Sequence, residues 1–379
     1  MKARALQLGR ALSAALFVLL LSVAGTKNAF AQQTLVATLQ HGEDLSIFYG
    51  MDAFVNAHAA AETGDIITLS SGSFNSTTIT KAITLRGAGF VTDTVSGTTP
   101  TVFNSAIVAN VSDTVNYLTI EGIRFNSSFT YKILNNPHFY KCYFNSFYNN
   151  QTTTTASQMT NAQFVNCRVK SFYFSASQVY ATNTSFINCV VWNLGGFYHG
   201  STSYGNTTWS NTSQYMAGSV VAINSIIRLG TSPTAVNAVN SIVIGYTYSS
   251  NSGSTNYSLS GSSSATNCIG IKYNSSSAPN PLGSSSIDSW LYTGLSAVFN
   301  DTNSETYWFE HFDIVSLDLK ESIATTKLGT DGTQVGIYGG VMPYTDRPSY
   351  MVIRHCNVAN QTDAENKLSV EIEVLNDGE

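Results

Sequence analysis

A short segment that recurs along the middle of the chain limits what this chain can fold into more than any other feature. Each copy has Phe or Ala first, Asn third and Cys or Ser fourth, followed by a largely apolar pair; the copies begin at Phe164, Phe186, Ala222, Ala238 and Ala265, with an earlier variant at Phe139. The Cys or Ser positions are separated by 25, 22, 36, 16 and 27 residues. Repeats of roughly 20 to 50 residues are typical of solenoids.

The chemistry of the copies selects the kind of solenoid. Each copy is short, apolar and β-prone, and no helical periodicity of matching length separates the copies. The strict six-residue period of left-handed β-helices is absent as well. We therefore predict an all-β protein, a right-handed parallel β-helix with roughly three short strands per coil.

Two residue types in the repeat are expected to form stacks across coils. We expect the Asn side chains to form a structural ladder, hydrogen-bonded to one another and to turn backbone; its members are Asn166, Asn188, Asn224, Asn240 and Asn267. Cys142, Cys167, Cys189 and Cys268 are read as small buried residues, with a disulfide or a metal site as the alternative. The fifth cysteine, Cys356, makes the number odd, which argues against a full disulfide framework.

Both ends of the solenoid carry sequences that can cover it. Met51, Phe54, Val55 and His58 have the spacing of an amphipathic helix, which predicts a helical cap at the N-terminal end with His58 packed rather than ligating. Apolar and acidic residues alternate over 368–374, which predicts a strand in a C-terminal β extension that caps the helix or begins another module. The predicted boundaries are 1–31 for a signal peptide, 32–63 for the N-terminal segment with its cap helix, 64–345 for the β-helix, and 346–379 for the extension.

Three segments carry a resemblance to a known group of proteins. The expected cap helix, Gly64-Asp-Ile-Ile-Thr-Leu-Ser-Ser-Gly-Ser-Phe74 and Ile83-Thr-Leu-Arg-Gly-Ala-Gly89 are similar to the opening of secreted pectate-lyase-like β-helix proteins of Bacteroidetes-type bacteria. The segment Gly329–Gly340 resembles the one that closes the helix in those proteins. The resemblance covers roughly residues 44–345 and implies the fold; it assigns no activity, because that superfamily contains lyases, hydrolases and esterases.

The first 31 residues indicate export. A basic start precedes a short apolar core at 12–24 and a small-x-small cleavage site at 29–31, which together predict a bacterial secretory signal peptide. Cleavage would leave 14 basic and 23 acidic residues. A chain with 11% charged residues and this acidic balance is not a charge-driven nucleic-acid binder. No later apolar run is long enough to predict a membrane span, so we expect a secreted, periplasmic or cell-surface protein.

The supply of carboxylates limits the chemistry. Glycoside hydrolysis needs two carboxylates across the scissile bond, and calcium-dependent lyase chemistry needs several for the metal. Residues 64–300 contain only five acids, and none of them is paired in sequence. We therefore expect no metal and no cofactor, and we give hydrolase activity little weight.

Two sets of residues remain as candidates. Strand alternation predicts that Lys141, Arg168 and Lys170 point outward, where they could serve a lyase acting on an acidic glycan; two solvated surface cations are the simpler interpretation. The long interval before Ser225 is rich in aromatics, and Trp192, at its start, is expected to face outward near Lys170. The candidate glycan-stacking residues are Trp192, Tyr198, Trp209 and Tyr215, although packing onto the solenoid is the alternative role for such a loop.

The function expected from these observations is an exported, non-catalytic β-helix protein of the cell envelope or surface that binds glycans or acts as an adhesive scaffold. A polysaccharide lyase using the Lys/Arg residues is the first alternative. A purely structural or phage-tail-like role is the second. The expected partner is a polysaccharide or a cell-surface glycan.

Overall fold

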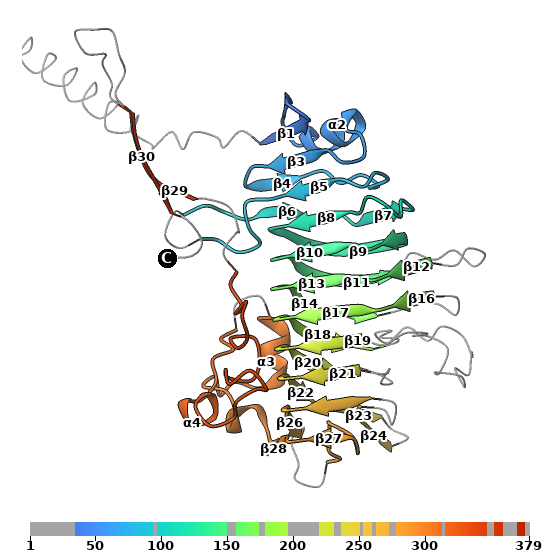
Figure 1. Cartoon of the computed structure of the whole chain (residues 1–379), viewed down its shortest axis with the longest axis vertical. Coiled ribbons are helices and arrows are strands. Elements are labelled where there is room, and N and C mark those ends of the chain that lie inside the picture. The colour runs from blue at the N-terminus through green and yellow to red at the C-terminus, as the bar shows by residue number, and fades with distance from the viewer. Residues whose placement is uncertain are drawn as a thin grey trace, which may run out of the picture. The chain divides into compact units, whose positions relative to one another are not determined.

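The computed structural model describes residues 35–93, 97–149, 157–173, 179–195, 220–230, 236–250, 253–259, 263–272, 278–312, 315–346, 352–358 and 370–375. The described part of the protein is mostly β, with 45% strand and 8% helix. Two long parallel sheets are stacked in register, an architecture consistent with a parallel β-solenoid (Figure 1). The predicted all-β class and parallel stacking are confirmed at this level.

The first sheet contains one strand from each successive coil. In spatial order its strands are β2 (Asp44–Tyr49), β1 (Val36–His41), β3 (Ile66–Leu69), β5 (Thr84–Arg86), β8 (Thr119–Glu121), β10 (His138–Tyr140), β13 (Gln163–Val165), β17 (Thr184–Ile187), β19 (Val220–Ile223), β21 (Val236–Val239), β25 (Ser264–Thr266) and β27 (Ser286–Ile287). From β3 onward the pairing is parallel, and only β2–β1 and β1–β3 are antiparallel.

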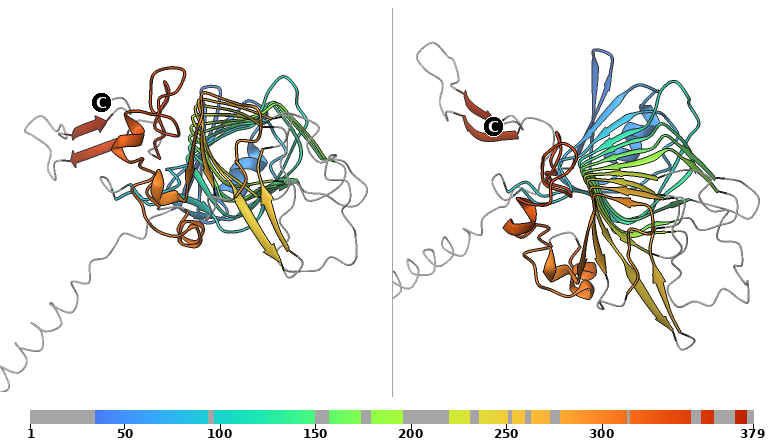
Figure 2. Two further views of the ribbon diagram at one scale, coloured as in Figure 1. Left: turned by 90° about the horizontal axis from the view of Figure 1, so that it is seen from below. Right: turned by 60° about the horizontal axis from the view of Figure 1, so that its bottom comes forward.

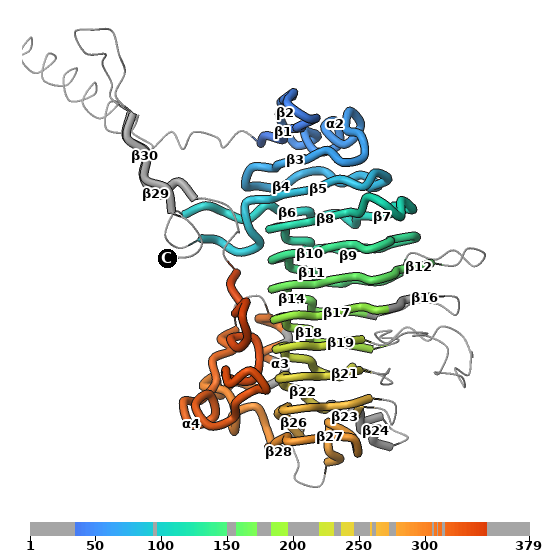
Figure 3. The backbone as a smooth tube through the Cα atoms, viewed as in Figure 1, coloured from blue at the N-terminus to red at the C-terminus, as the bar shows by residue number. Residues whose placement is uncertain are grey.

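The second sheet receives the strand that follows in each coil. Its main path is β16 (Val179–Thr182), β12 (Ser157–Thr160), β9 (Ile123–Asn135), β11 (Tyr143–Asn149), β14 (Arg168–Val169), β18 (Val190–Leu194), β20 (Ile226–Leu229), β22 (Ile242–Ile244), β26 (Ile269–Lys272) and β28 (Trp290–Thr293). β4 (Gly72–Phe74), β6 (Thr101–Phe103), β7 (Ile107–Val111) and β15 (Phe172–Tyr173) pair beside this path. The tube in Figure 3 can be followed from one sheet to the other, coil by coil.

The remaining elements are short. Two antiparallel pairs stand apart from the long sheets: β23 (Tyr246–Ser250) with β24 (Gly253–Tyr257), and β29 (Val352–Val358) with β30 (Val370–Leu375). The helices of the described residues are α2 (Ala53–Ala60), η2 (Leu295–Ala297), α3 (Glu305–Glu310) and α4 (Glu321–Ala324). The described parallel strands end at Thr293, and the described residues after it form no further coil of the two sheets.

Helix α2 packs against β1, β2 and β3 of the first sheet and is also held at its C-terminal end. Phe54 and His58 are buried, and the ring nitrogen Nε2 of His58 accepts the Thr80 N–H at 3.3 Å. The Lys81 ammonium donates to the carbonyls of His58 and Ala61 at 2.8 and 2.6 Å. A cation at the last turn compensates for carbonyls that the helix leaves unpaired. His58 is therefore a packed residue, as expected.

Aromatic ladders fill the space between the sheets. Phe125 stacks on Phe144 at a centroid distance of 4.9 Å and an interplanar angle of 4°. Similar parallel stacks join Phe129 to Phe147, Phe147 to Phe172, Phe139 to Phe164 and Phe164 to Phe186. Identical side chains stack in this way because the sheet repeats the same position in every coil, and each ring buries a large apolar area.

The Cys and Ser positions of the repeat form a buried column with a defined hydrogen-bonding role. The Ser225 hydroxyl donates to the Ile223 carbonyl at 2.8 Å and accepts the Cys189 N–H at 3.1 Å. Cys167 makes the same contacts, to the Val165 carbonyl at 3.3 Å and from the Cys142 N–H at 3.5 Å. The position therefore requires a small side chain with one polar atom, which both Cys and Ser provide. Cys142, Cys167, Cys189 and Cys268 are free and buried, as predicted.

The Asn ladder is present, but its main role differs from the predicted one. All five predicted Asn residues adopt left-handed backbone, with φ between 47° and 52°. Each amide N–H bonds across to the next coil, as in Asn188 N–H to Ile223 C=O at 3.0 Å. Asn is among the few residues that tolerate this conformation. The turn geometry therefore explains the residue type.

A second Asn ladder, which we did not predict, has the side-chain bonds expected of the first. Asn183 Nδ2 donates to Asn161 Oδ1 at 2.9 Å, and Asn161 Nδ2 donates to Asn136 Oδ1 at 2.8 Å. These residues also have positive φ, and each lies one or two residues before a strand of the first sheet. The amide-to-amide ladder thus lies at the corner where coils enter the first sheet, not at the corner where they leave it.

A second hydrophobic core lies outside the solenoid, on the outer face of the second sheet. The sheet contributes a column of apolar side chains, and the segment 295–344 covers it with its own. The buried members from the sheet include Val190, Trp192, Ile226, Ile242 and Ile269; those from the segment include Val298, Phe299, Trp308, Phe312, Val335 and Ile337. In Figures 1 and 2 this segment, with α3 and α4, runs beside the coils. The chain thus turns back along its own second sheet.

Candidate functional site

The outer face of the first sheet carries a group of aromatic and charged side chains near its N-terminal end. The register aligns Thr84, Thr119 and His138 in one column, and Arg86, Glu121 and Tyr140 in the next. The residue between them in each strand is buried, as Ile120 and Phe139 are. Because strand side chains alternate, the flanking residues face outward. The three short strands therefore display one continuous surface.

Three rings form what we call the aromatic strip: Tyr117, His138 and Tyr140. The Tyr117 and His138 ring centroids are 4.6 Å apart, and those of His138 and Tyr140 are 6.0 Å apart. Tyr117 is 43% exposed and lies just before β8, whereas the other two rings are half-buried within β10. The strip thus has an accessible ring at its rim and two supported rings beside it.

An ion pair adjoins the strip. Arg86 Nε lies 3.8 Å from Glu121 Oε2, and Glu121 is adjacent to Tyr140 in the sheet register. The guanidinium is largely exposed while the carboxylate is largely covered. The pair contributes little to folding stability at such exposure. It does place a charged hydrogen-bond donor, the guanidinium, and a charged acceptor, the carboxylate, next to the three rings.

His138 and Tyr140 of the strip are uncharged at neutral pH. Burial lowers the pKa of His138, so its imidazole is neutral. Burial, followed by the nearby Tyr117 and Glu121, raises the pKa of Tyr140, so its hydroxyl keeps its proton. A neutral imidazole and a phenol each offer both a donor and an acceptor. Flat apolar faces bordered by such groups are suited to sugar rings and their hydroxyls.

The structure places the three cationic candidates differently from our prediction. Arg168 is only 6% exposed; its Nε donates to the Tyr344 hydroxyl at 2.8 Å and its Nη1 to the Phe312 carbonyl at 2.9 Å. Lys141 is 8% exposed and occupies a left-handed corner with φ 48°, not a strand. Lys170 is half-buried. The expectation of a solvent-facing cation set is wrong for Arg168 and Lys141, because the covering segment and the corner geometry enclose them.

Trp192 faces outward from the coil as predicted, but it is not available for stacking on a ligand. It is 1% exposed, with its ring centroid 5.8 Å from Trp308 and 6.1 Å from Phe312. The Arg228 guanidinium lies 5.3 Å from its centroid on another side. Trp192 is therefore a core residue of the covered face. The other candidates, Tyr198, Trp209 and Tyr215, lie outside the described residues.

The predicted Asn ladder contacts the covering segment. Asn188 Nδ2 donates to the carbonyls of Ile337 and Gly339 at 2.7 and 2.8 Å. Asn240 Oδ1 accepts the Thr330 N–H at 2.9 Å. The segment Gly329–Gly340, which resembles a closing segment in sequence, therefore lies along the corner of the coils and supplies partners to their Asn side chains.

Sequence reasoning missed the aromatic strip, although a signal for it exists. Thr119-Ile-Glu and His138-Phe-Tyr each place one buried residue between two outward ones, and the two segments align only when they are stacked in register. The repeat reasoning aligned the Cys columns and gave less weight to the outward positions. Tyr117 has no such signal, because it precedes the strand.

The described residues contain no group of three or more His, Cys, Asp or Glu side chains arranged to hold a metal ion. Among their helices, none has the length and apolar character needed to cross a membrane. Comparisons of the chain with protein-family models, with curated proteins and with solved structures found no match.

Proposed function

We propose that the protein is an exported, non-catalytic scaffold of the cell envelope or surface that binds glycans through the aromatic strip. The observation that carries this proposal is the alignment of Tyr117, His138 and Tyr140 on one sheet face beside the Arg86–Glu121 pair. We further propose that the solenoid is a right-handed β-helix with α2 as its N-terminal cap and the residues from 346 onward as its C-terminal extension.

The strip supports a binding role for physical reasons. A sugar ring laid on Tyr117 would bury apolar C–H groups, and its hydroxyls would meet neutral donors and acceptors instead of water. The strands beneath are fixed by the parallel ladder, so the rings are held in place before a ligand arrives. A repeating polysaccharide would contact several coils at once, because the coils follow one another at about 4.8 Å.

Burial weighs against the lyase alternative at two of its three proposed residues. A Lys/Arg site needs cations that can reach the substrate, and Arg168 and Lys141 are both buried. Arg168 is instead engaged by the Tyr344 hydroxyl and the Phe312 carbonyl. A structural or phage-tail-like role is the remaining alternative, and it predicts no glycan retention.

The test is native electrophoresis of the purified protein in gels cast with neutral and acidic polysaccharides. We expect retardation by at least one polysaccharide without clearing of the gel around the band. The variant carrying Tyr117→Ala and Tyr140→Ala should lose most of this retardation. Tyr307→Ala is the matched control, because Tyr307 is 37% exposed and its ring centroid lies 4.2 Å from that of His311, on α3 and not in the strip.

Three results would overturn the proposal. Clearing of the gel would show catalysis. Unchanged retardation in the double variant would place glycan binding elsewhere on the chain, and absence of any retardation across the panel would favour the structural role.

A further inference from the structure

The N-terminal edge of the first sheet ends in a strand with an open side. In the described part of the chain, β2 pairs with β1 and stands last in the order of that sheet. Its six residues pair with β1 without a register shift, from Val36 with Tyr49 to His41 with Asp44. A regular edge strand presents a row of backbone N–H and C=O groups that another strand can pair with.

The outward face of this edge is apolar. Leu45, Ile47 and Tyr49 alternate along β2 and are 62%, 49% and 64% exposed. Phe48, on the opposite face, packs against the core. A monomeric edge strand that exposes three large apolar side chains in a row indicates a surface that is covered in use.

This edge has few of the features that normally prevent pairing. The segment Asp44–Tyr49 contains no Lys, Arg or Pro, and its pairing with β1 shows no bulge. The edge at the other end of the same sheet differs, because β27 is only two residues long. Short strands, basic residues, prolines and bulges are the usual protection against edge-to-edge contact. β27 has such protection and β2 does not.

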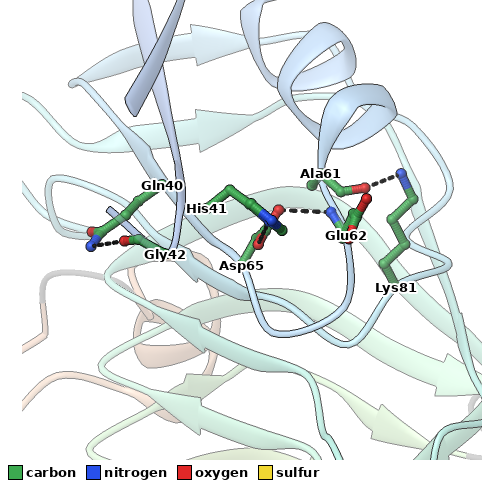
Figure 4. A network of polar contacts seen from close by, with 7 residues as sticks. All are labelled: Gln40, His41, Gly42, Ala61, Glu62, Asp65 and Lys81. Atoms are coloured by element: carbon green, nitrogen blue, oxygen red, sulfur yellow. Dashed lines mark hydrogen bonds and ion pairs between the residues drawn. The ribbon is translucent and has the colours of Figure 1, made fainter. Parts of the chain in front are cut away.

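The β1–β2 hairpin is anchored in a fixed position. His41 Nδ1 lies 2.7 Å from Asp65 Oδ1, and Asp65 Oδ2 accepts the Glu62 N–H at 2.7 Å (Figure 4). Asp65 is 5% exposed, so the hairpin tip is tied to a buried carboxylate. The edge is therefore formed before any partner arrives, which lowers the entropic cost of pairing.

We propose that this edge is a homodimer interface, in which β2 pairs antiparallel with β2 of a second copy across a two-fold axis. The strand is complementary to itself in one register. With Ile47 opposite its own symmetry mate, Leu45 faces Tyr49 on both sides, and the two Asp44 carboxylates lie at opposite ends of the pair. All three exposed apolar residues of each copy then share one face. An interface of this kind closes on itself and gives dimers.

We take the partner to be a second copy because β2 is complementary to itself when two copies pair antiparallel. The same three apolar residues are supplied from both sides, and no like charges are opposed in the central register. The first sheet would continue from one copy into the other. The proposal is independent of the glycan-binding role, since the aromatic strip lies on later strands.

The experiment is sedimentation equilibrium of the purified protein over a range of concentrations. We expect a monomer–dimer equilibrium for the unaltered chain. Ile47→Lys places two ammonium groups across the axis and should weaken the dimer more than about tenfold. Ile287→Lys is the control at the other end of the sheet, where Ile287 is 62% exposed, and it should leave the dimer unchanged. Mixing Ile47→Lys with Ile47→Glu should restore dimers only in the mixture.

Cross-linking tests the register, in a Cys356→Ser background. Opposed residues of an antiparallel pair have Cα atoms about 4.5–5.5 Å apart, a distance that a disulfide can span. Ile47→Cys should therefore link to itself, whereas Leu45→Cys should link only when it is mixed with Tyr49→Cys. A monomer at every concentration, unbounded oligomers, or a dimer unaffected by both Ile47→Lys and Leu45→Lys would overturn the proposal. Circular dichroism confirms that each variant is folded.

Discussion

The outer faces of the two sheets are built from the same coils, but one is covered by a later segment and the other carries half-buried or exposed side chains. On the second sheet, Val190, Ile226, Ile242 and Ile269 form an apolar column that residues 295–344 cover. On the first sheet, the neighbouring strands place half-buried or exposed side chains outward, among them the aromatic strip. The difference shows that in a solenoid the inward positions fix the coil, whereas the outward positions decide whether a face becomes a second core or a surface for partners.

The largest expected effect compares two isoleucines of one coil. Ile226 lies on the covered face at 1% exposure, and Ile223 is a half-buried outward residue of the first sheet. Ile226→Ala removes buried methyl groups and leaves a cavity under the covering segment, so it should cost about 2–5 kcal/mol of unfolding free energy. Ile223→Ala should cost about 1 kcal/mol or less. Urea unfolding of both variants measures the difference, and equal losses would contradict the contrast between the faces.

The covered outer face of the second sheet shows how much of the fold could be predicted from the sequence. The consecutive apolar pairs Val190-Val191, Ile226-Ile227 and Ile242-Val243 indicate strands buried on both sides, which is typical of parallel sheets between two layers. The identity of the cover could not be derived from these pairs. Trp308 and Phe312 lie more than 100 residues from Trp192, within a segment that has no repeat to set its register.

The left-handed corner at the repeat's Asn residues shows a different limit of prediction from sequence. The repeat correctly indicated that the Asn residues align, because their spacing follows the coil. Alternation then placed Lys141 on a strand, although the chain has already turned at that residue with φ 48°. Strand periodicity holds only while the backbone is extended. The end of each short strand therefore had to come from the structure, and with it the burial of Lys141.

The second prediction concerns the two Asn corners. Asn188 has φ 50° and donates to two carbonyls of the covering segment, Ile337 and Gly339. Asn188→Ala should cost about 2–4 kcal/mol, because it strains a left-handed turn and leaves buried carbonyls unpaired. Asn188→Gly keeps the turn and should recover about 1 kcal/mol of that loss.

The control for this corner is Asn183, whose exposed side chain donates to Asn161 at 2.9 Å at the corner entering the first sheet. Asn183→Gly should cost about 1 kcal/mol or less, since water replaces the lost bond. If Asn188→Gly and Asn183→Gly were equally destabilising in thermal and urea unfolding, the covering segment would not account for the importance of Asn188.

The smallest expected effect is a pH dependence of folding stability that arises from His41, in the β1–β2 hairpin at the edge of the first sheet. The hydrogen bond to Asp65, reinforced by the charges of Asp65, Glu62 and Asp44, raises the pKa of His41 above its usual value. A histidine whose pKa is higher in the folded than in the unfolded state stabilises the fold fully below the unfolded pKa of about 6.5. That stabilisation disappears as the pH rises through the folded-state pKa.

The pKa of His58, in the nearby helix α2, is shifted in the opposite direction from that of His41. Burial, followed by the nearby Lys81, lowers its pKa, so its protonation in acid opposes folding. Comparing the unaltered protein with His41→Gln isolates the first histidine, because His58 is present in both. The midpoint of thermal unfolding should be higher for the unaltered protein near pH 5.5 and converge with that of the variant as the pH rises. A difference that grows with pH would show that His41 does not stabilise the hairpin through its charged form.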